Sequence, residues 1–527
     1  MKILFVIACL SLGGGVWGAT SAEARSKPNI IFIIADDLGY GDLSAYGQEH
    51  FTTPNIDRLA ETGLKFTRHY SGATVCAPSR CSLMTGKDGG HATVRGNGAV
   101  SIRDEEVTVA EVAKAAGYQT AMIGKSCVTG NTQTPEKVLQ SGFDYFYGTT
   151  DHRDGHFRYP KFVYRNTGRV DFPGNKLHSG THYDGKLYTE EALAYLAQQS
   201  EETPFFMILS YPIPHASIIA PEADRAAART FVEEEVVFEN SKHYTNTPEV
   251  LANYIGMVTI MDQAVGSIVN QLKDQGLYED TLVIFTSDNG AAFEGGKTPE
   301  MLNSNGPLRG GKRDLYEGGI RIPFIASWPA MIDAGRSSDH PSAFWDFLPT
   351  VCELVDQPIP EDIQGLSYVP TLLGREEQVE HPYLYWEFHE RGGRRALQQG
   401  DWKLVQYNVN KPAKLQTELY HLGQDIAESR DLAKSHPEKL SEMLKLIEDA
   451  RVPSAEFFTL SMAHCKVDLY VRSAAEVQSL SRSCTLALRS NLAWLITGLK
   501  HRNFCIRLAD RSLLQWFLQV GRVENAN

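Results

Sequence analysis

The 527-residue sequence contains only eight cysteines and no apolar run long enough to span a lipid bilayer. A chain of this length with so few cysteines does not rely on a dense disulfide framework for its fold. The sequence also lacks excess positive charge, because 64 acidic residues outnumber 51 lysines and arginines and give a net charge of −13. This balance argues against a nucleic-acid-binding protein. An anionic ligand would have to be met by a local cluster of basic side chains.

The first residues have the pattern of a secretory signal peptide. Lys2 is followed by an apolar run over residues 3–12 and then by small residues ending at Ala24. We therefore expect residues 1–24 to be a signal peptide and the mature protein to be exported, either periplasmic or secreted, without a transmembrane anchor.

The rest of the chain divides into three predicted regions. Apolar stretches alternate with helical patterns over residues 27–373, which predicts a large α/β domain. Short strands at hairpin spacing and an amphipathic helix over residues 437–451 predict a small sheet-plus-helix domain at 374–458. Residues 459–527 form an atypical basic tail to which the sequence assigns no role.

Four apolar stretches in the large domain predict buried strands, and charged or polar residues follow each of them. The stretches are 29–35, 119–123, 204–211 and 281–286. The alternation of strands with helices predicts a mostly parallel sheet, and ligands bind beyond the carboxyl ends of such strands. We therefore expect the residues after these strands to converge at one edge: Asp36, Asp37, Lys125, His215, Asp288 and Asn289.

Two adjacent carboxylates end the first of these strands. Asp36 and Asp37 would repel each other at a buried sheet edge unless a cation lay between them. A hard divalent ion with oxygen ligands satisfies this requirement. The alternative is a solvated Asp-Asp turn.

The segment from Cys76 to Arg80 predicts a turn that leads into a helix, because Pro78 is tolerated in a first helical turn. Free backbone N–H groups at this helix start, together with the Arg80 guanidinium, would form a pocket for an oxyanion with Cys76 inside it. The alternative is a buried thiol beside a surface arginine.

Local signals predict other helix starts and a basic loop. Thr53 is the expected cap of a helix that begins with Pro54, and Thr108 and Glu111 have the spacing of a capping box. Residues 306–313 form a glycine-rich loop that carries Lys312, and such a loop taken alone is usually only solvated.

The order of these motifs from residue 27 to about residue 458 resembles the type I sulfatases of the alkaline-phosphatase superfamily, including bacterial exported arylsulfatase-like enzymes. The matching segments are 28–30 with 36–37, 53–60, 76–80, 117–118 with 124–125, 214–215, 287–290, 308–312 and 317–323. The resemblance implies an alkaline-phosphatase-like α/β sandwich with a large, mostly parallel central sheet flanked by helices. It also implies a smaller C-terminal antiparallel sheet-and-helix domain.

The resemblance implies a calcium-dependent sulfate-ester hydrolase. It implies Ca²⁺ bound by Asp36, Asp37, Asp288 and Asn289 and facing residue 76. In this family a formylglycine-generating enzyme oxidises the cysteine at the position of Cys76 to formylglycine. One hydroxyl of the hydrated aldehyde attacks sulfur, and the second then expels sulfate.

The resemblance also assigns roles to basic residues. Arg80 would orient the hydrated aldehyde, and Lys125 and Lys312 would balance charge on the sulfate and the leaving group. His215 would give a proton to the leaving oxygen.

One position departs from the family pattern. The family commonly has Lys-Trp-His where this chain has Lys125, Ser126 and Cys127. Another histidine from a neighbouring loop could take this place, and the candidates are His91, His152 and His156. Residues 155–160 resemble a substrate-side segment of some bacterial members, so we expect His156 and His91 to contact the substrate.

The substrate implied by export and by polar residues near the sheet edge is a sulfated sugar, with the pocket extended by Trp386, His389, Arg391 and Arg394 of the small domain. Two other functions stay open. A phosphodiesterase or phosphonate hydrolase of the same superfamily would share the metal ligands. A non-catalytic glycan-binding relative would retain the fold and an intact thiol at Cys76.

Overall fold

The computed structural model describes residues 27–239, 244–454 and 456–457. Its central element is strand β1 (Asn29–Asp36), which is buried along its whole length and has sheet neighbours on both sides. Burying one aliphatic side chain of this size contributes about 1.5–3 kcal/mol, so a strand that is apolar on both faces is stable only inside a sandwich. The predicted signal peptide and the predicted basic tail lie outside the described residues.

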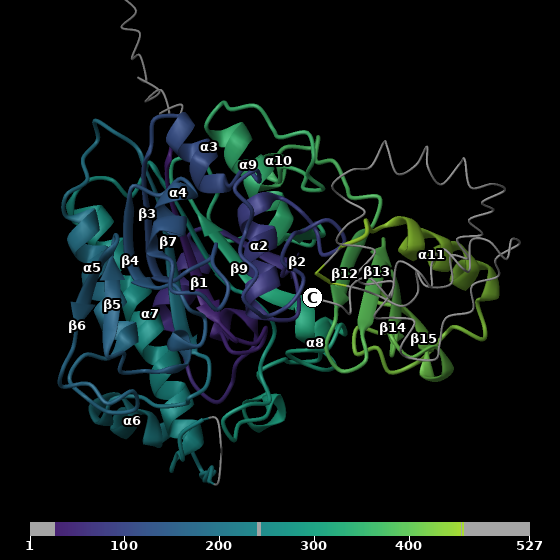
Figure 1. The fold of residues 1–527 in the computed structure, drawn as a ribbon, viewed down its shortest axis with the longest axis horizontal. Coiled ribbons are helices and arrows are strands. Elements are labelled where there is room, and N and C mark those ends of the chain that lie inside the picture. Colours follow the sequence, from purple (N-terminus) through teal and green to yellow (C-terminus); the bar gives the residue numbers. More distant parts are fainter. Residues whose placement is uncertain (1–26, 240–243, 455, 458–527) are drawn as a thin grey trace, which may run out of the picture. The chain divides into compact units, whose positions relative to one another are not determined.

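The large sheet has eleven strands, and its central part is parallel (Figure 1). Across the sheet the order is β10 (Arg336–Ser338), β2 (Leu64–Tyr70), β9 (Arg321–Ser327), β8 (Thr281–Ser287), β1, β7 (Phe205–Pro214), β3 (Gln119–Lys125), β4 (Tyr145–Thr149), β5 (Phe162–Arg165) and β6 (Gly168–Asp171), with β11 (Ser342–Ala343) paired to β2. Strands β8, β1, β7, β3 and β4 run parallel to one another, whereas β9 is antiparallel to β8. The predicted mostly parallel central sheet is confirmed.

Helices cover both faces of this sheet, and the alternation of side chains along β1 divides the core into two clusters. Ile31 and Ile33 belong to one cluster, with residues of α1 (Pro54–Glu61), α5 (Asp184–Leu196) and α7 (Val250–Asp274). Ile30 and Phe32 belong to the other, with residues of α2 (Cys76–Thr85), α3 (Val109–Ala115) and α9 (Phe347–Leu354). The shorter helices are α4 (Pro135–Gln140), α6 (Glu222–Ala228), α8 (Glu317–Ile320) and α10 (Val369–Leu372).

The predicted helix starts have different outcomes. At α3 the Thr108 hydroxyl accepts from the Glu111 amide at 3.2 Å, and the Glu111 carboxylate accepts from the Thr108 amide at 2.8 Å, which confirms the capping box. At α1, Thr53 occupies the cap position but its side chain caps no amide. Asp262 of α7 accepts from two first-turn amides at 2.9 Å instead. The predicted cap position and helix start are confirmed, but the Thr53 hydroxyl does not cap the helix, because a carboxylate from another helix takes that role.

A separate antiparallel sheet follows, as predicted for the C-terminal domain. It contains β12 (Leu384–Phe388), β13 (Arg394–Gln399), β14 (Trp402–Tyr407) and β15 (Gln416–His421), in sequence order. Helix α11 (Pro437–Asp449) covers one face, because its buried Met443 and Ile447 join a cluster with Leu397 and Leu404. The exact limits of the two domains remain a prediction.

Buried polar contacts join the small sheet to the large domain. The ammonium group of Lys403 in β14 lies 2.8 Å from the Glu317 carboxylate and 2.9 Å from that of Glu428, and all three side chains are buried. The indole of Trp386 in β12 donates to the backbone carbonyl of Ser71 at 2.9 Å. Buried charges are costly unless they are paired, so these contacts favour one fixed arrangement of the two sheets.

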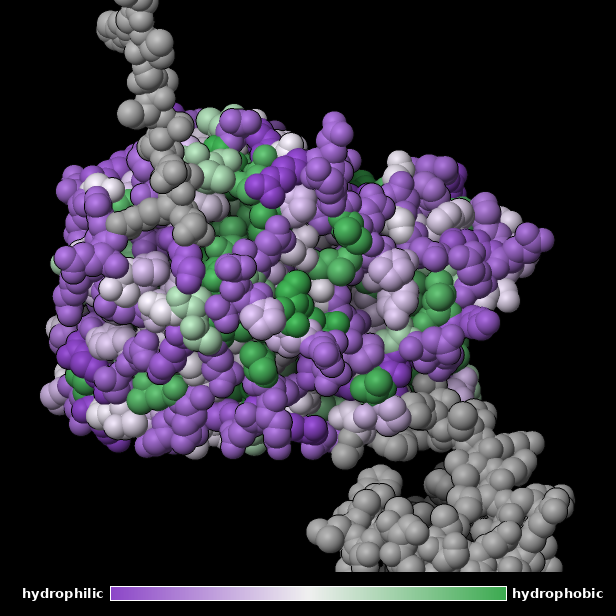
Figure 2. All heavy atoms as spheres, turned by 90° about the horizontal axis from the view of Figure 1, so that it is seen from above, coloured by the Kyte–Doolittle hydropathy of each residue, from purple (hydrophilic) through white to green (hydrophobic). Residues whose placement is uncertain are grey.

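The surface is predominantly polar. In Figure 2, hydrophilic side chains cover most of the visible face and apolar ones are scattered in small groups. None of the helices in the described part of the chain combines the length and apolar character needed to cross a membrane.

Candidate active site

The residues expected at the carboxyl edge of the sheet do come together there. Lys125 ends β3, and the position before it must be glycine. A Cβ atom on Gly124 would lie 2.0 Å from the Ser210 carbonyl oxygen of β7, and the backbone φ of Gly124 is +105°. Beyond this close approach of β3 and β7, the Lys125 ammonium group lies 2.5 Å from the Asp36 carboxylate at the end of β1.

Three carboxylates and one amide form a compact group between β1 and β8. The Asp288 carboxylate accepts from the backbone N–H of Asp37 at 3.1 Å. The Asn289 side-chain amide donates to the Asp37 carboxylate at 2.8 Å. All of these side chains, with that of Asp36, are buried. The carboxylates therefore face one another in an environment from which water is largely excluded.

The donor atoms of this group suit a hard divalent cation. Ligand atoms of Asp36, Cys76 and Asp288 lie within 4.8 Å of one another, as do those of Asp36, Asp37 and His215. Oδ1 of Asp36 and Oδ1 of Asn289 are buried and accept no hydrogen bond from the described residues. Buried acceptors without donors are costly, and a cation with oxygen ligands would satisfy both.

The electrostatic environment of the carboxylates also favours a bound cation. Burial and the neighbouring Asp36 charge raise the pKa of Asp288 to about 7. Burial would also raise the pKa of Asp36, but Lys125, His215 and Arg80 hold it well below its usual range. Packing this much negative charge at one point is unfavourable without cations.

Cys76 is the first residue of α2, as the sequence predicts, and every residue of this helix is buried. Its predecessor Val75 has no side chain able to cap the helix. Instead, Asn97 from the following loop accepts from the Ala77 backbone N–H at 3.3 Å, and the Cys76 thiol lies 3.7 Å from the same oxygen. Burial raises the pKa of the Cys76 thiol, so the unmodified side chain is neutral at pH 7.

Arg80, one turn further along α2, connects the helix to the carboxylates. Its Nη2 and Nε lie 2.8 and 3.0 Å from Oδ2 of Asp288, and Nη2 lies 3.5 Å from Asp36. A third donor, Nη1, reaches the Ser210 hydroxyl at 2.5 Å. Burial opposes its charge, but Asp288 and other acidic neighbours raise the pKa of the guanidinium above its usual value.

Lys312 enters the site from the glycine-rich loop rather than lying in solvent. Its ammonium group is 2.7 Å from the Asp37 carboxylate and 3.2 Å from that of Glu294. Burial opposes the charged form, yet Asp37 and Glu294 raise the pKa of Lys312 well above its usual value. Lys125 behaves in the same way because burial is outweighed by Asp36. Both lysines are therefore cations at neutral pH.

Two histidine rings stack on each other near the carboxylate group. The rings of His156 and His215 are 4.3 Å apart and nearly parallel, at 14°. Nδ1 of His215 donates to the Ala216 carbonyl, and its Nε2 lies 3.5 Å from the Asp37 carboxylate. Burial and the Lys312 charge lower the pKa of His215, so its imidazole is neutral at pH 7 in the absence of other ligands.

The position that departs from the family pattern is buried beside Arg80. The Cys127 sulfur lies 3.6 Å from Nη1 of Arg80, and burial raises the pKa of its thiol. His152 lies near by, with Nε2 3.0 Å from the Ser126 carbonyl oxygen. His91 is placed differently, because its Nδ1 lies 2.7 Å from Asp88. The structure thus brings His156 and His152 to the neighbourhood of Lys125 but does not join His91 to the other predicted residues.

Sequence reasoning missed two polar contacts of the site. Asn97 touches both Cys76 and the start of α2, and Glu294 bridges Lys312 and Arg313. Both residues lie in loops without regular secondary structure, and both are distant in the chain from the residues that they contact. No periodicity or spacing distinguishes either residue.

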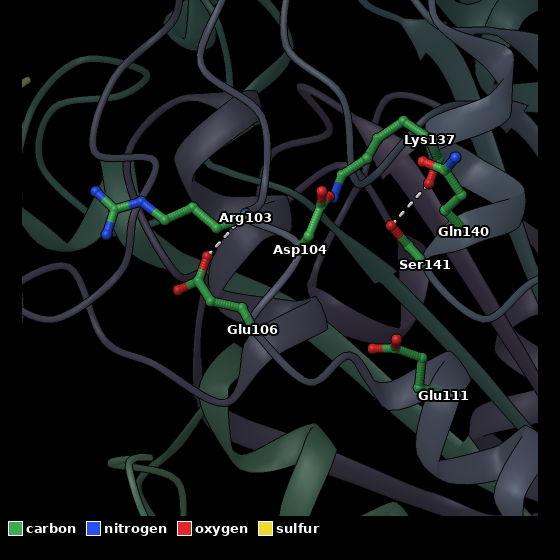
Figure 3. Close-up of a pocket in the computed structure, with 7 residues that line it drawn as sticks. All are labelled: Arg103, Asp104, Glu106, Glu111, Lys137, Gln140 and Ser141. Carbon is green, nitrogen blue, oxygen red and sulfur yellow. Dashed lines mark hydrogen bonds and ion pairs between the residues drawn. The ribbon is translucent and has the colours of Figure 1, made fainter.

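A separate pocket of about 250 Å³ lies beside α3 and α4 (Figure 3). It is lined by charged and polar residues, namely Arg103, Asp104, Glu106, Glu111, Lys137, Gln140 and Ser141. Several of these are already paired, such as Lys137 with Asp104 at 2.6 Å. None of the predicted site residues lines it, and its geometry indicates no chemistry.

Comparison with known proteins shows that this chain is related to sulfate-ester hydrolases. A family model described as "Sulfatase" matches residues 28–357, which is more than half of the chain. A second, described as "N-sulphoglucosamine sulphohydrolase, C-terminal", matches residues 311–451. The first match covers the large sheet, and the second covers the small sheet together with β9, β10 and β11 of the large one.

Individual relatives align over most of the chain. N-acetylgalactosamine-6-sulfatase of Canis lupus familiaris is 29% identical over 542 residues, covering 98% of this chain and 93% of that protein. Steryl-sulfatase of Homo sapiens is 31% identical over 474 residues, covering 73% and 75%. The crystal structure of Ps i-CgsB in complex with k-i-k-neocarrahexaose is 27% identical with a TM-score of 0.67, covering 80% of this chain and 92% of that one. The alkaline-phosphatase-like fold expected from the sequence is thereby confirmed.

Proposed function

Because the chain belongs to the sulfatase family and is a sulfuric ester hydrolase, we propose that it removes sulfate from a sulfated carbohydrate. Several relatives named N-acetylgalactosamine-6-sulfatase and the solved complex of Ps i-CgsB with k-i-k-neocarrahexaose support a sugar. The observation that carries the proposal is the position of residue 76. It begins a buried helix directly beside a group of carboxylates and cations.

The metal in this proposal is Ca²⁺, held by Asp36, Asp37, Asp288 and Asn289. Three carboxylates and an amide oxygen are hard donors, and the buried oxygens without partners on Asp36 and Asn289 support a cation at this point. When bound, Ca²⁺ would supply a Lewis acid for the sulfate oxygens.

Residue 76 acts in this proposal as formylglycine, made from Cys76 by a formylglycine-generating enzyme. The unmodified thiol is a weak candidate for the nucleophile, because burial raises its pKa and keeps it protonated. The hydrated aldehyde would supply two hydroxyl groups, one to attack sulfur and one to expel sulfate afterwards. The amino end of α2 favours negative charge on an oxygen at this position.

The chain's own cations bind and orient the sulfate ester. Lys125 and Lys312 approach from opposite ends of the carboxylate pair Asp36 and Asp37, and both are charged at neutral pH. Arg80 is held by Asp288 with its guanidinium beside Asp36, next to residue 76 on the same helix. Preorganised charges of this kind stabilise charge that develops in the transition state.

His215 is the proposed proton donor to the leaving oxygen. Because its Nδ1–H is used by the Ala216 carbonyl, only Nε2 faces the site. The imidazole therefore donates only after Nε2 is protonated, which a bound sulfate anion would favour. His156, stacked on His215, keeps the ring in place and lies on the substrate side.

We propose further that the protein is exported, on the strength of the residue 1–24 pattern. The test of the function compares turnover of N-acetylgalactosamine 6-sulfate and of an aryl sulfate with turnover of an aryl phosphodiester by the matured protein. We expect sulfate release from the first two. Preferential cleavage of the phosphodiester would favour the phosphodiesterase or phosphonate hydrolase alternative.

A further inference from the structure

Asn97 differs from the other polar residues around the nucleophile in being exposed. Arg80, Lys125 and Lys312 are all buried, whereas the side chain of Asn97 lies in solvent. Its carboxamide oxygen nevertheless lies only 3.7 Å from the sulfur of Cys76. A ligand that approaches residue 76 from solvent therefore meets Asn97 before it meets the buried cations.

The two ends of the Asn97 amide have different environments. Its oxygen is occupied, because it accepts from the Ala77 amide at 3.3 Å and stands beside the Cys76 thiol. An amide group is planar, so its NH₂ group points away from the atoms that engage the oxygen. Among the described residues, nothing accepts a hydrogen bond from Nδ2 of Asn97, so its two N–H donors lie exposed next to residue 76.

The loop that carries Asn97 is held firmly. Arg95 is buried, and its guanidinium donates to the carbonyls of Ala92 and Val452 at 2.8 and 3.0 Å and to Glu387 at 3.1 Å. A Cβ atom on Gly96 would lie 3.0 Å from the Phe457 ring, so the backbone is packed there as well. A side chain on an anchored loop loses little freedom when it binds a ligand, which favours a recognition role.

We propose that Asn97 recognises the sugar, by donating a hydrogen bond from Nδ2 to an oxygen of the ring that carries the scissile sulfate. This inference rests on the proposed function, because it requires a substrate with ring oxygens beside the ester. Asn97 is then a specificity residue, and Arg95 is the residue that positions it.

The test measures kcat/KM for two substrates in each variant: a sulfated monosaccharide, N-acetylgalactosamine 6-sulfate, and 4-nitrophenyl sulfate, whose aromatic ring offers no hydroxyl groups. Asn97→Asp keeps an oxygen to cap α2 but loses the N–H donors, and Asn97→Ala loses both. Asn270→Asp, at an exposed position of α7, is the matched control for the change of charge.

We expect both Asn97 variants to lower the ratio of sugar to aryl kcat/KM about tenfold, the usual effect of one lost hydrogen bond. The Asn270 variant should keep the wild-type ratio. Asn97 acts only as a helix cap if Asn97→Asp keeps that ratio too, and the inference then fails. Wild-type protein that cleaves 4-nitrophenyl sulfate but no sulfated monosaccharide would instead refute the proposed carbohydrate substrate.

Discussion

Arg80 and Asp288 form a fully buried ion pair in which two guanidinium nitrogens, Nη2 and Nε, share one carboxylate oxygen at 2.8 and 3.0 Å. The other Asp288 oxygen accepts from the backbone of Asp37. One carboxylate therefore fixes the helix that carries residue 76 to the ends of β1 and β8. The position of the proposed nucleophile depends on the same carboxylate that faces the proposed cation.

Replacement of Cys76 tests the nucleophile. Cys76→Ser should fold but lose nearly all multiple-turnover activity, because a simple hydroxyl would be trapped as its sulfate ester. Mass spectrometry of the peptide that contains residue 76 should show an aldehyde in wild-type protein. Cys352→Ser, at another buried free cysteine, is the control and should keep activity. Sustained turnover by Cys76→Ser would refute the mechanism.

Removal of the metal tests the ligand set. Chelation should abolish turnover and lower the Tm, because the buried carboxylates then repel one another, and added Ca²⁺ should restore both. Asp288→Asn should weaken Ca²⁺ binding measured by calorimetry. Metal analysis that finds stoichiometric zinc and no calcium in active protein would show the assignment to be wrong.

Because Cys127 departs from the family pattern, we expect substitutions at His215, Lys312 and Cys127 to have unequal effects. His215→Ala and Lys312→Ala should each lower kcat/KM at least a hundredfold, since they remove a proton donor and a cation from the site. Cys127→Ala should keep most activity, because the neutral thiol accepts only a long hydrogen bond of 3.6 Å from Nη1 of Arg80, which also donates to Ser210 at 2.5 Å. Kinetics of the three variants on one sulfated substrate decide this. Equal damage at Cys127 and His215 would mean that the thiol has a direct role.

The pH dependence of stability can be predicted at Asp184, which starts α5. Its carboxylate lies 3.4 Å from Arg158, and burial raises its pKa to about 7. The folded protein therefore binds this proton more tightly than the unfolded chain. This contribution to stability is complete below about pH 4 and is lost as the pH rises to about 7.

Its size is on the order of 4 kcal/mol. Denaturant unfolding of wild-type protein and of Asp184→Asn across this pH range should show a steeper decline for the wild type. The comparison concerns the slope of stability against pH, because the substitution also removes the carboxylate partner of Arg158. Parallel curves for the two proteins would contradict the prediction.

The elements that the sequence predicted are those with strong local signals. Buried strands such as β1 and β8 are nearly continuous apolar runs, and their carboxyl ends lead to polar residues that meet in the site. Lys312 lacks such a local signal, because the pattern of its loop taken alone predicts only a solvated side chain. The structure buries its ammonium group against Asp37, a residue 275 positions away in the chain.

Other features depend on tertiary contacts that no local pattern contains. The cap of α1 comes from Asp262 rather than from Thr53. The cap of α2 comes from Asn97, twenty residues beyond Ala77. In both cases the helix start is visible in the sequence, but the group that satisfies it is chosen by packing.

The guanidinium of Arg95 joins the loop that carries Asn97 to Glu387 in the small sheet, whereas the proposed reacting groups lie at the edge of the large sheet. Mutations in the small sheet can therefore act on this loop without touching Lys125 or Asp36. During evolution such a layout lets a lineage change its choice of sugar without redesigning its chemistry. It also means that loss of the Glu387 carboxylate alone would weaken the anchor of this loop without removing any proposed reacting group.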